Sequence, residues 1–154
     1  MSVVLDQPIP DFSVAATTGD TLTSAALKGR RYVLYFYPKD ATPGCTLESQ
    51  QFRDLHPQFQ QANCDIYGVS RDSLKSHDKF RENQCLPFAL LSDPDETLCR
   101  LFDVIKTKNM YGKQVQGIER STFLIDENGV LRHEWRKVKA DGHAQVVLDA
   151  VLSI

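Results

Sequence analysis

The sequence predicts an α/β fold in which a mixed central sheet lies between helices. The strongest signal is a nearly continuous run of β-branched and aromatic residues, RRYVLYFYP at 30–38, typical of a strand buried on both faces. Helix and strand patterns alternate after it, and a hairpin around Asn128-Gly129 precedes a closing amphipathic helix. The length fits one domain over residues 1–154.

The individual elements follow one another without a visible linker, internal repeat or low-complexity tract. In chain order we expect two strands in 11–23, a helix in 24–29, a strand in 30–38, a helix ending near 63, a strand in 64–70, a helix from 72 or 73 to about 84, a strand in 87–93, a helix opening at 93, an irregular loop in 105–119, a hairpin in 120–136 and a final helix. This order predicts a thioredoxin-like fold with an N-terminal β extension.

Turn and breaker residues set the boundaries in the first half of the chain. The first two strands flank the turn signal Thr18-Gly19-Asp20, and the first short helix ends at Gly29. Because a proline cannot donate its backbone nitrogen, Pro57 predicts a kink or a break into two abutting helices.

Capping residues mark the helix starts in the middle of the chain. Either Asp72 or Ser73 is expected to cap the helix that reaches Gln84. The next helix opens on DPDE, in which Asp93 fits the cap position and Glu96 completes a capping box.

The last third combines an irregular segment with two clear patterns. In RSTFLIDENGVLRHEWR, two alternating strands flank Asn128-Gly129, the strongest short-range signal for a hairpin. The final helix is expected to bury one apolar face, made of Val146, Val147, Ala150 and Val151.

Composition and charge argue against nucleic-acid and membrane partners. The net charge is −2, so the chain creates no global basic field. Arg132, His133, Arg136 and Lys137 are expected to form a solvated strand face. The N-terminus, MSVVLDQPIPDFS, lacks the basic start and apolar run of a signal peptide, and no stretch approaches the ~18 apolar residues of a membrane span. These features predict a cytoplasmic protein.

Four cysteines in a reducing compartment are expected to be thiols that are catalytic, metal-binding or simply buried. Cys64 alternates with Ile66 in a predicted strand, and Cys99 lies beside apolar residues of a helix, so both are expected to be structural. The cysteine and histidine spacings contain no paired zinc ligands, and we expect neither a metal nor a cofactor.

Cys45 differs from these because it opens a helix directly after the central strand, in YPKDATPGCTLES. With Thr42 as the cap and Pro43 as the first helical residue, Gly44 and Cys45 occupy the second and third positions. Backbone N–H groups there have no intrahelical partner, and together with the helix dipole they favour a thiolate.

Thiolate formation alone gives little catalysis. An ordinary thiol with a pKa of ~8.5 is ~3% ionised at pH 7, so complete ionisation gains at most about 30-fold. A lower pKa also weakens the nucleophile, by roughly tenfold for a fall of ~2.5 units. A fast site must therefore stabilise the transition state of its reaction.

Two motifs give the chain a resemblance to a known family. The segment PKDATPGCT matches the Pro-x-x-x-Thr-x-x-Cys signature of peroxiredoxins, and GIERSTFLID resembles the later strand that carries their arginine. The stretches TLESQQF, YGVSRDS, LLSD and NMYGK resemble the bacterial Q-type (bacterioferritin-comigratory) branch, and the likeness covers nearly the whole chain.

The resemblance implies a thiol peroxidase that reduces hydrogen peroxide and organic hydroperoxides. Cys45 would become a sulfenic acid as the O–O bond breaks. Arg120 would hydrogen-bond the reacting groups, Thr42 would orient the peroxide, and the backbone amides of Gly44 and Cys45 would hold an oxygen. Pro38 would shield the pocket from water.

The same resemblance raises the question of which thiol resolves the sulfenic acid. Many Q-type relatives carry a second cysteine five positions after the first, but this chain has Gln50 there. Others carry it near the position of Arg81, one helical turn before Cys85. We therefore expect a Cys45–Cys85 disulfide formed after local unwinding, with a one-cysteine mechanism as the alternative. Thioredoxin is the implied reductant for the disulfide, and glutaredoxin or a small thiol for the alternative; a monomer is expected.

Competing classes lack residues that their chemistry needs. A thioredoxin-type oxidoreductase requires a cysteine at Glu48, and a cysteine-dependent phosphatase requires an arginine at Gln51. A thioredoxin-fold chaperone or binding module remains the non-enzymatic alternative. The segment Lys106–Lys113 is expected either to border the pocket through Met110 and Tyr111 and favour bulkier peroxides, or to be a plain surface loop.

Overall fold

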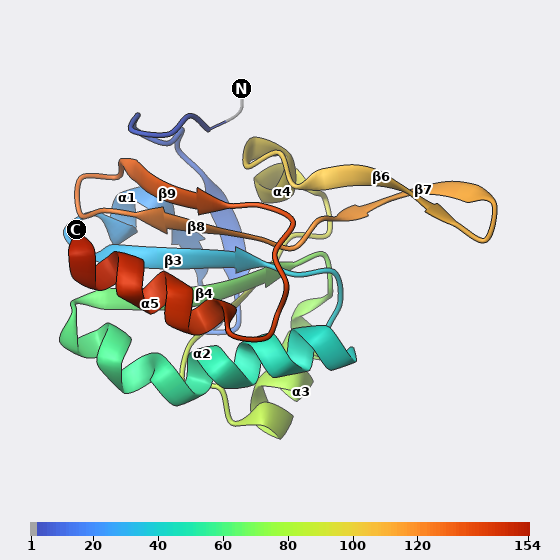
Figure 1. The fold of residues 1–154 in the computed structure, drawn as a ribbon, viewed down its shortest axis with the longest axis horizontal. Helices are drawn as coiled ribbons and strands as arrows, with labels where there is room; N and C mark the ends of the chain where they lie inside the picture. Colours follow the sequence, from blue (N-terminus) through green and yellow to red (C-terminus); the bar gives the residue numbers. More distant parts are fainter. Residues whose placement is uncertain (1–2) are drawn as a thin grey trace.

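A computed structural model describes residues 3–154 of the chain. Its strands are β1 Ser13–Ala16, β2 Thr21–Thr23, β3 Arg31–Phe36, β4 Cys64–Ser70, β5 Leu90–Ser92, β6 Ile105–Met110, β7 Lys113–Ile118, β8 Ser121–Ile125 and β9 Leu131–Trp135. Seven of them form one sheet in the order β2-β1-β5-β4-β3-β8-β9 (Figure 1). The neighbours β3, β4 and β5 are parallel, and the other pairs are antiparallel. The predicted mixed sheet with added N-terminal strands is confirmed.

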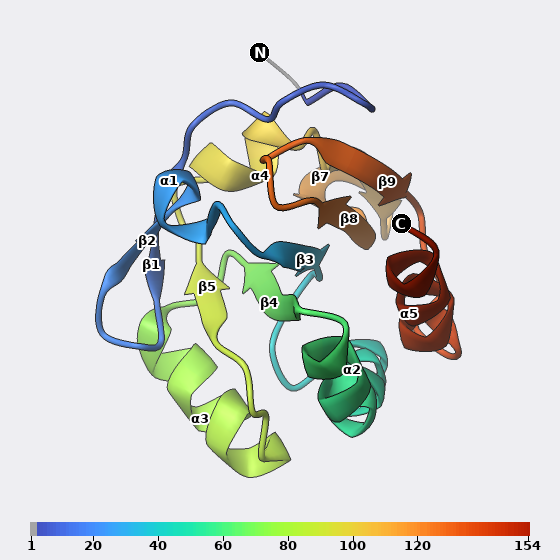
Figure 2. The same ribbon diagram turned by 90° about the vertical axis from the view of Figure 1, so that its left-hand side faces the viewer.

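Helices cover both faces of this sheet. They are α1 Ser24–Leu27, α2 Pro43–Gln61, α3 Leu74–Gln84, α4 Thr97–Leu101 and α5 His143–Ser153. Figure 2 shows α2, α3 and α5 on one face and α1 and α4 on the other. The central strand β3 serves both layers: the ring of Tyr35 stacks on Phe52 of α2, whereas Phe36 packs against Phe102 and Phe123. This two-sided burial explains why 30–38 reads as a continuous apolar run.

Helix α2 remains a single element through Pro57. A break into two abutting helices, one of the two predicted outcomes, does not occur. Phe52 and Phe59 are fully buried on either side of the proline. We attribute the continuity to this apolar face, because packing against the sheet outweighs one lost backbone hydrogen bond.

The sequence predicted the cap of α3 correctly but not the cap of α4. Ser73 caps α3 as expected, and its hydroxyl accepts a hydrogen bond from the Ser76 amide. The capping box predicted for α4 is wrong, because Asp93 and the residues after it form a turn and the helix begins only at Thr97. The Asp93 carboxylate still accepts the Leu98 and Cys99 amides, so it stabilises the helix start from further upstream.

The segment expected to be an irregular loop is a two-stranded hairpin, β6–β7, which projects from the body (Figure 1). Its turn residues Tyr111 and Gly112 both have positive φ, 53° and 77°, as in a type I′ turn. The alternation was hard to recognise because most residues of β7 are exposed on both sides.

The apolar face predicted for α5 is partly wrong. In α5, Val147 and Val151 are buried as expected, but Val146 is 50% exposed and Leu148 takes the place expected for it. The apolar residues of α3 also differ in burial: Phe80 is buried, whereas Leu74 is 37% exposed. Both helices pack on a narrower stripe than the apolar residues alone suggest.

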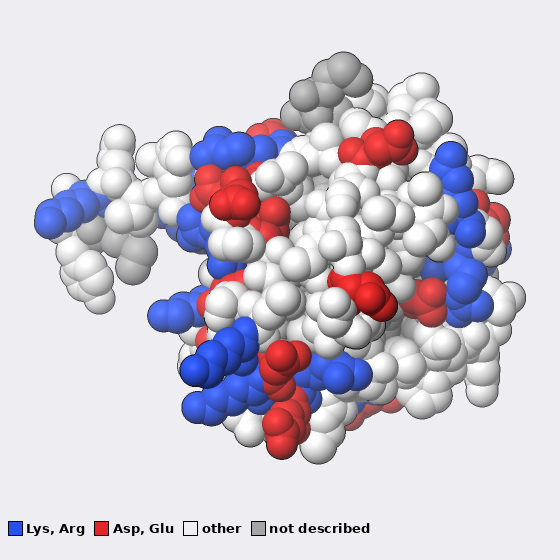
Figure 3. Space-filling view, turned by 180° about the vertical axis from the view of Figure 1, so that it is seen from behind, with Lys and Arg blue, Asp and Glu red and all other residues white. Residues whose placement is uncertain are grey.

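Charges of both signs are dispersed over the surface. Figure 3 shows blue and red groups interspersed on one face, with neither sign forming a continuous area. Lys137 is exposed as predicted, but Arg136 lies 5.1 Å over the Phe123 ring and donates to the Phe102 and Asp103 carbonyls. Among residues 3–154, no helix has the length and apolar character needed to cross a membrane.

Candidate active site

The turn after β3 delivers Cys45 to the first turn of α2, as the sequence predicts. Thr42 is the extended residue before the helix and Pro43 its first member. The Thr42 hydroxyl does not cap the helix; it donates a 2.8 Å hydrogen bond to the Lys39 carbonyl. The predicted side-chain cap is therefore wrong. Because its proton is committed to Lys39, the Thr42 oxygen faces a ligand as a hydrogen-bond acceptor.

Arg120 reaches the sulfur from the start of the strand next to β3. It directly precedes β8, which pairs with β3 so that Phe36 lies opposite Ser121. Its Nη2 atom donates to Cys45 Sγ over 3.4 Å, and Cys45 is only 1% exposed. Burial opposes the charge of Arg120, but Glu48 and Cys45 outweigh it and raise the pKa of the guanidinium. A permanent positive charge therefore adjoins the thiol.

Glu48 is the site residue that sequence reasoning missed. It lies one helical turn after Cys45, is fully buried, and its Oε1 accepts a 2.7 Å hydrogen bond from Arg120 Nη1. Burial raises the pKa of Glu48 to about 7, although Arg120 acts in the opposite direction. The available signal was the three-residue spacing, which puts a carboxylate on the same buried helix face as the cysteine.

Gly44 makes room for the guanidinium. A Cβ atom added at Gly44 would lie 3.0 Å from Arg120 Nη2, closer than carbon and nitrogen normally approach. The sequence predicts a role for the Gly44 backbone amide. The structure adds that the absence of a side chain lets Arg120 pack against the start of the helix.

A cavity of about 780 Å³ opens beside Arg120 and Pro38. Its other walls come from β6, from the link between β7 and β8 and from the segment after β9: Lys106, Thr107, Lys108, Glu119, Lys137, Val138 and Lys139. The hairpin therefore borders the pocket through β6. Tyr111 is 99% exposed and is absent from this lining, and the Met110 side chain lies outside the described part of the chain.

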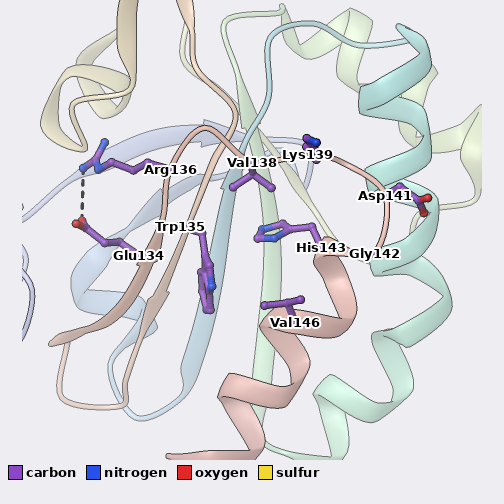
Figure 4. Close-up of a pocket in the computed structure, with 9 residues that line it drawn as sticks. All are labelled: Glu134, Trp135, Arg136, Val138, Lys139, Asp141, Gly142, His143 and Val146. Carbon is purple, nitrogen blue, oxygen red and sulfur yellow. Dashed lines mark ion pairs between the residues drawn. The ribbon is translucent and has the colours of Figure 1, made fainter.

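A second cavity, of about 540 Å³, lies between β9 and the start of α5 and is lined by Trp135, Val138 and His143 (Figure 4). His143 Nε2 lies 2.8 Å from the Thr122 hydroxyl. Burial lowers the pKa of His143 to about 4, and the Arg120 charge acts in the same direction. Neither cavity is lined by a cysteine, and of the two only the first has Arg120 in its wall. His143 supports the strand that follows Arg120.

The remaining cysteines fall into two kinds. Cys64 and Cys99 are fully buried, as predicted, and burial raises the pKa of Cys64 to about 12 and that of Cys99 still further. Cys85 is exposed and ends α3 with a left-handed φ of 53°. All four cysteines are free thiols.

Cys85 lies beside the middle of α2, away from the end that carries Cys45. Its neighbour Gln84 accepts hydrogen bonds from Gln50 and Arg53. Arg53 is eight residues after Cys45, a distance of about 12 Å along the helix. A Cys45–Cys85 bond therefore requires local rearrangement, as the sequence reasoning anticipated.

One group of possible metal ligands occurs in the described residues: Asp40, Asp72 and His77, whose nearest ligand atoms lie within 4.8 Å of one another. Hydrogen bonds engage these atoms. His77 Nδ1 is 2.7 Å from Asp40 Oδ2, and Asp72 Oδ2 accepts from Ser70 and from the Asp40 amide. The three residues therefore form a hydrogen-bonded network.

Comparisons with known proteins agree with this geometry. The AhpC/TSA family model matches residues 5–134. The chain is 54% identical over 150 residues to peroxiredoxin Bcp of Xanthomonas campestris, covering 96% of this chain and 94% of the relative. It is 47% identical over 151 residues to peroxiredoxin Bcp of Bacillus subtilis, covering 98% and 96%.

Solved structures give the same result. A structure of the Xanthomonas campestris bacterioferritin comigratory protein superposes with a TM-score of 0.91 at 52% identity, covering 99% of this chain and 98% of that one. A cysteine-to-serine mutant of Xylella fastidiosa PrxQ gives 0.94 at 42% identity, with the same coverage. The thioredoxin-like fold predicted from the sequence is confirmed. The chain belongs to the AhpC/TSA family and, within it, to the bacterioferritin comigratory protein (peroxiredoxin Q) branch.

Proposed function

We propose that Cys45 is the peroxidatic thiol of this peroxiredoxin. Its thiolate attacks the terminal oxygen of a hydroperoxide, forming an S–O bond as the O–O bond breaks. Sulfur loses two electrons and becomes a sulfenic acid, while the departing oxygen takes up a proton and leaves as water or an alcohol. The observation that carries this proposal is the buried Arg120 guanidinium 3.4 Å from Cys45 Sγ.

Arg120 and the helix start stabilise the charge that moves during this step. Negative charge passes from sulfur to the departing oxygen, and Arg120 stays within reach of both while Glu48 fixes its orientation. A charge-assisted hydrogen bond contributes about 1.5–3 kcal/mol, roughly 10- to 150-fold in rate. The Thr42 oxygen accepts a hydrogen bond from the peroxide O–H, and the amides of Gly44 and Cys45 hold the attacked oxygen.

The substrates we propose are hydrogen peroxide and organic hydroperoxides. The cavity beside Pro38 and Arg120 has a volume of about 780 Å³, ample for an alkyl group. The Xanthomonas campestris relative was studied for alkyl peroxide reduction, in trapped intermediate and ligand complexes. Pro38 forms part of the wall and limits the access of water to the reacting atoms.

Cys85 is the proposed resolving thiol. Its thiolate attacks the Cys45 sulfenic sulfur, an S–S bond forms, and the oxygen leaves as water after protonation. Two observations support it: Cys85 is the one exposed thiol among the four, and its left-handed conformation makes the end of α3 costly to maintain, by about 1–2 kcal/mol. Its neighbour Gln84 also contacts Gln50, the position from which other members resolve the sulfenic acid.

The disulfide needs an external dithiol reductant, which we propose is thioredoxin in a cytoplasmic setting. We propose a monomer, in which Cys85 is exposed to such a reductant. The alternative is a one-cysteine cycle in which glutaredoxin or a small thiol reduces Cys45 directly. A non-enzymatic chaperone role would not need the Arg120–Cys45 contact.

Peroxide-dependent NADPH oxidation with thioredoxin and its reductase tests the proposal. Cys45→Ser should abolish turnover, whereas the matched buried variant Cys64→Ser should retain it. Cys85→Ser should lose thioredoxin-linked turnover but still consume one equivalent of peroxide. Unchanged turnover in Cys45→Ser would reject the proposed peroxidatic role, and full thioredoxin-linked turnover in Cys85→Ser would favour the one-cysteine cycle.

A further inference from the structure

A buried polar cluster connects the turn before Cys45 to helix α3. We call it the Asp40 cluster and define it as Tyr37, Asp40, Asp72, Ser76 and His77. The Asp40 carboxylate accepts hydrogen bonds from the Tyr37 hydroxyl at 2.6 Å and the Ser76 hydroxyl at 2.9 Å, and lies 2.7 Å from His77 Nδ1. The Asp40 carboxylate on the turn therefore links Tyr37, which follows β3, to helix α3.

His77 has an oxygen atom within hydrogen-bond distance of each ring nitrogen. Its Nε2 atom lies 2.8 Å from the Leu91 carbonyl, which can only accept, and its Nδ1 atom faces the Asp40 carboxylate. His77 is fully buried and the Asp40 side chain is 3% exposed, so no solvent replaces these bonds when they break.

The backbone of the turn is fixed at the same point. The Asp40 amide donates to Asp72 Oδ2 at 2.8 Å, and Ser70 holds that carboxylate in place. The next residue, Ala41, has a φ of 63°, a left-handed conformation that is unfavourable for a non-glycine residue. The cluster therefore holds a strained turn, and Thr42 to Cys45 follow directly from it.

The position of the cluster matters because its other end lies on the helix that carries Cys85. His77 lies eight residues, just over two turns, before Cys85 on α3. A disulfide requires the two cysteine Cα atoms to approach within ~4.4–6.8 Å, and Cys45 must leave Arg120 to do so. Breaking the contact between Asp40 and α3 frees the turn for that movement.

We propose that the Asp40–His77 pair is a positioning pair: it holds Cys45 in the conformation that reduces peroxide, and its opening allows Cys45 to reach Cys85. The proposal that the pair holds Cys45 in place depends only on the Asp40 cluster. The proposal that its opening allows Cys45 to reach Cys85 also rests on the proposed resolving role of Cys85. The pair thereby sets how the sulfenic acid divides between disulfide formation and oxidation by a second peroxide.

The test measures two rate constants in the full chain. The second-order constant for Cys45 oxidation by hydrogen peroxide and the first-order constant for disulfide formation are followed by acid quench and mass spectrometry. Asp40→Asn keeps the size of the side chain but removes its charge. It should slow oxidation roughly tenfold and accelerate disulfide formation roughly tenfold. Asp78→Asn, an exposed change next to His77, should alter neither.

Opposite changes in the two rates identify a positioning role, because a general loss of stability would lower both. Ser76→Ala, which removes one hydrogen bond to Asp40, is a milder variant for use if Asp40→Asn fails to fold. It should shift both rates two- to threefold in the same directions as Asp40→Asn. Rates within twofold of wild type in both variants, or a fall in both rates, would overturn the proposal. If Cys85 stays reduced in every variant, the assignment of Cys85 fails, while slower oxidation in Asp40→Asn still supports the hold on Cys45.

Discussion

Arg120 Nη2 lies 3.4 Å from Cys45 Sγ, although 75 positions separate the two residues in the chain. The adjacency of β3 and β8 produces this contact, because one strand ends where the thiol-bearing turn begins and the other starts just after the arginine. The same guanidinium bonds Glu48 at 2.7 Å. A buried carboxylate thus fixes the cation that faces the sulfur.

Arg120→Ala should slow the oxidation of Cys45 by peroxide roughly tenfold or more, because the departing oxygen loses its charged donor. The measurement is the second-order rate constant, with circular dichroism to verify the fold. Arg100→Ala is the control, since that side chain is 59% exposed and forms a surface pair that contributes little. A loss of only about twofold in Arg120→Ala would contradict the assigned role.

Glu48 should make folding stability depend on pH. Its pKa is raised from 4.5 to about 7, so the folded state binds its proton more tightly than the unfolded state does. Its contribution is complete below pH 4.5 and is lost as the pH rises through 7, by at most about 3 kcal/mol.

Urea unfolding at several pH values between 4.5 and 8 measures this effect. Glu48→Gln should flatten the fall in the free energy of unfolding over that range, whereas the exposed change Glu82→Gln should not. The same pH dependence in wild type and Glu48→Gln would show that the carboxylate titrates normally.

Gly44→Ala should displace Arg120, because the added methyl would lie 3.0 Å from Nη2. We expect peroxide oxidation of Cys45 to slow several-fold, as for a misplaced catalytic donor. A double-mutant cycle provides the control: in an Arg120→Ala background, Gly44→Ala should cost little more. Independent, additive losses would mean that the glycine acts through its backbone alone.

Cys64 and Cys99 should resist alkylation in the native protein. Burial raises the pKa of both thiols, to about 12 for Cys64, and hides them from reagent. Iodoacetamide at pH 8 followed by peptide mapping should label Cys85 well before either of them. Rapid native labelling of Cys64 would contradict the burial described here.

The sequence predicted most of the site but not its support. Cys45, Thr42, Pro38 and Arg120 lie in two recognisable motifs, and the contact between Cys45 and Arg120 could be anticipated from them. The role of Glu48 could not be anticipated in the same way, because an acidic side chain in a helix is normally expected to be exposed to solvent. Only the packing of the fold shows that this turn of α2 faces the sheet. The Asp40 cluster combines residues from the turn after β3, the loop after β4 and helix α3, and no local spacing in the sequence indicates that they meet.

Predictions from local sequence patterns failed for the β6–β7 hairpin and for the start of α4. The β6–β7 hairpin has few buried residues, so it lacks the apolar alternation that marks a strand, although Tyr111-Gly112 supplies a suitable turn. Asp93 satisfies two amides of α4 from outside the expected cap, because the intervening turn moves the helix start to Thr97.

The central claim is that the thiol beside Arg120 is the one that reduces peroxide. The most direct measurement is a rapid acid quench of the fully reduced protein after one equivalent of hydrogen peroxide, with mass spectrometry of each cysteine peptide over time. We predict that Cys45 gains one oxygen atom first, and that a disulfide with Cys85 then appears with first-order kinetics. Oxygen appearing first on Cys64, Cys85 or Cys99, with Cys45 still reduced, would contradict the account.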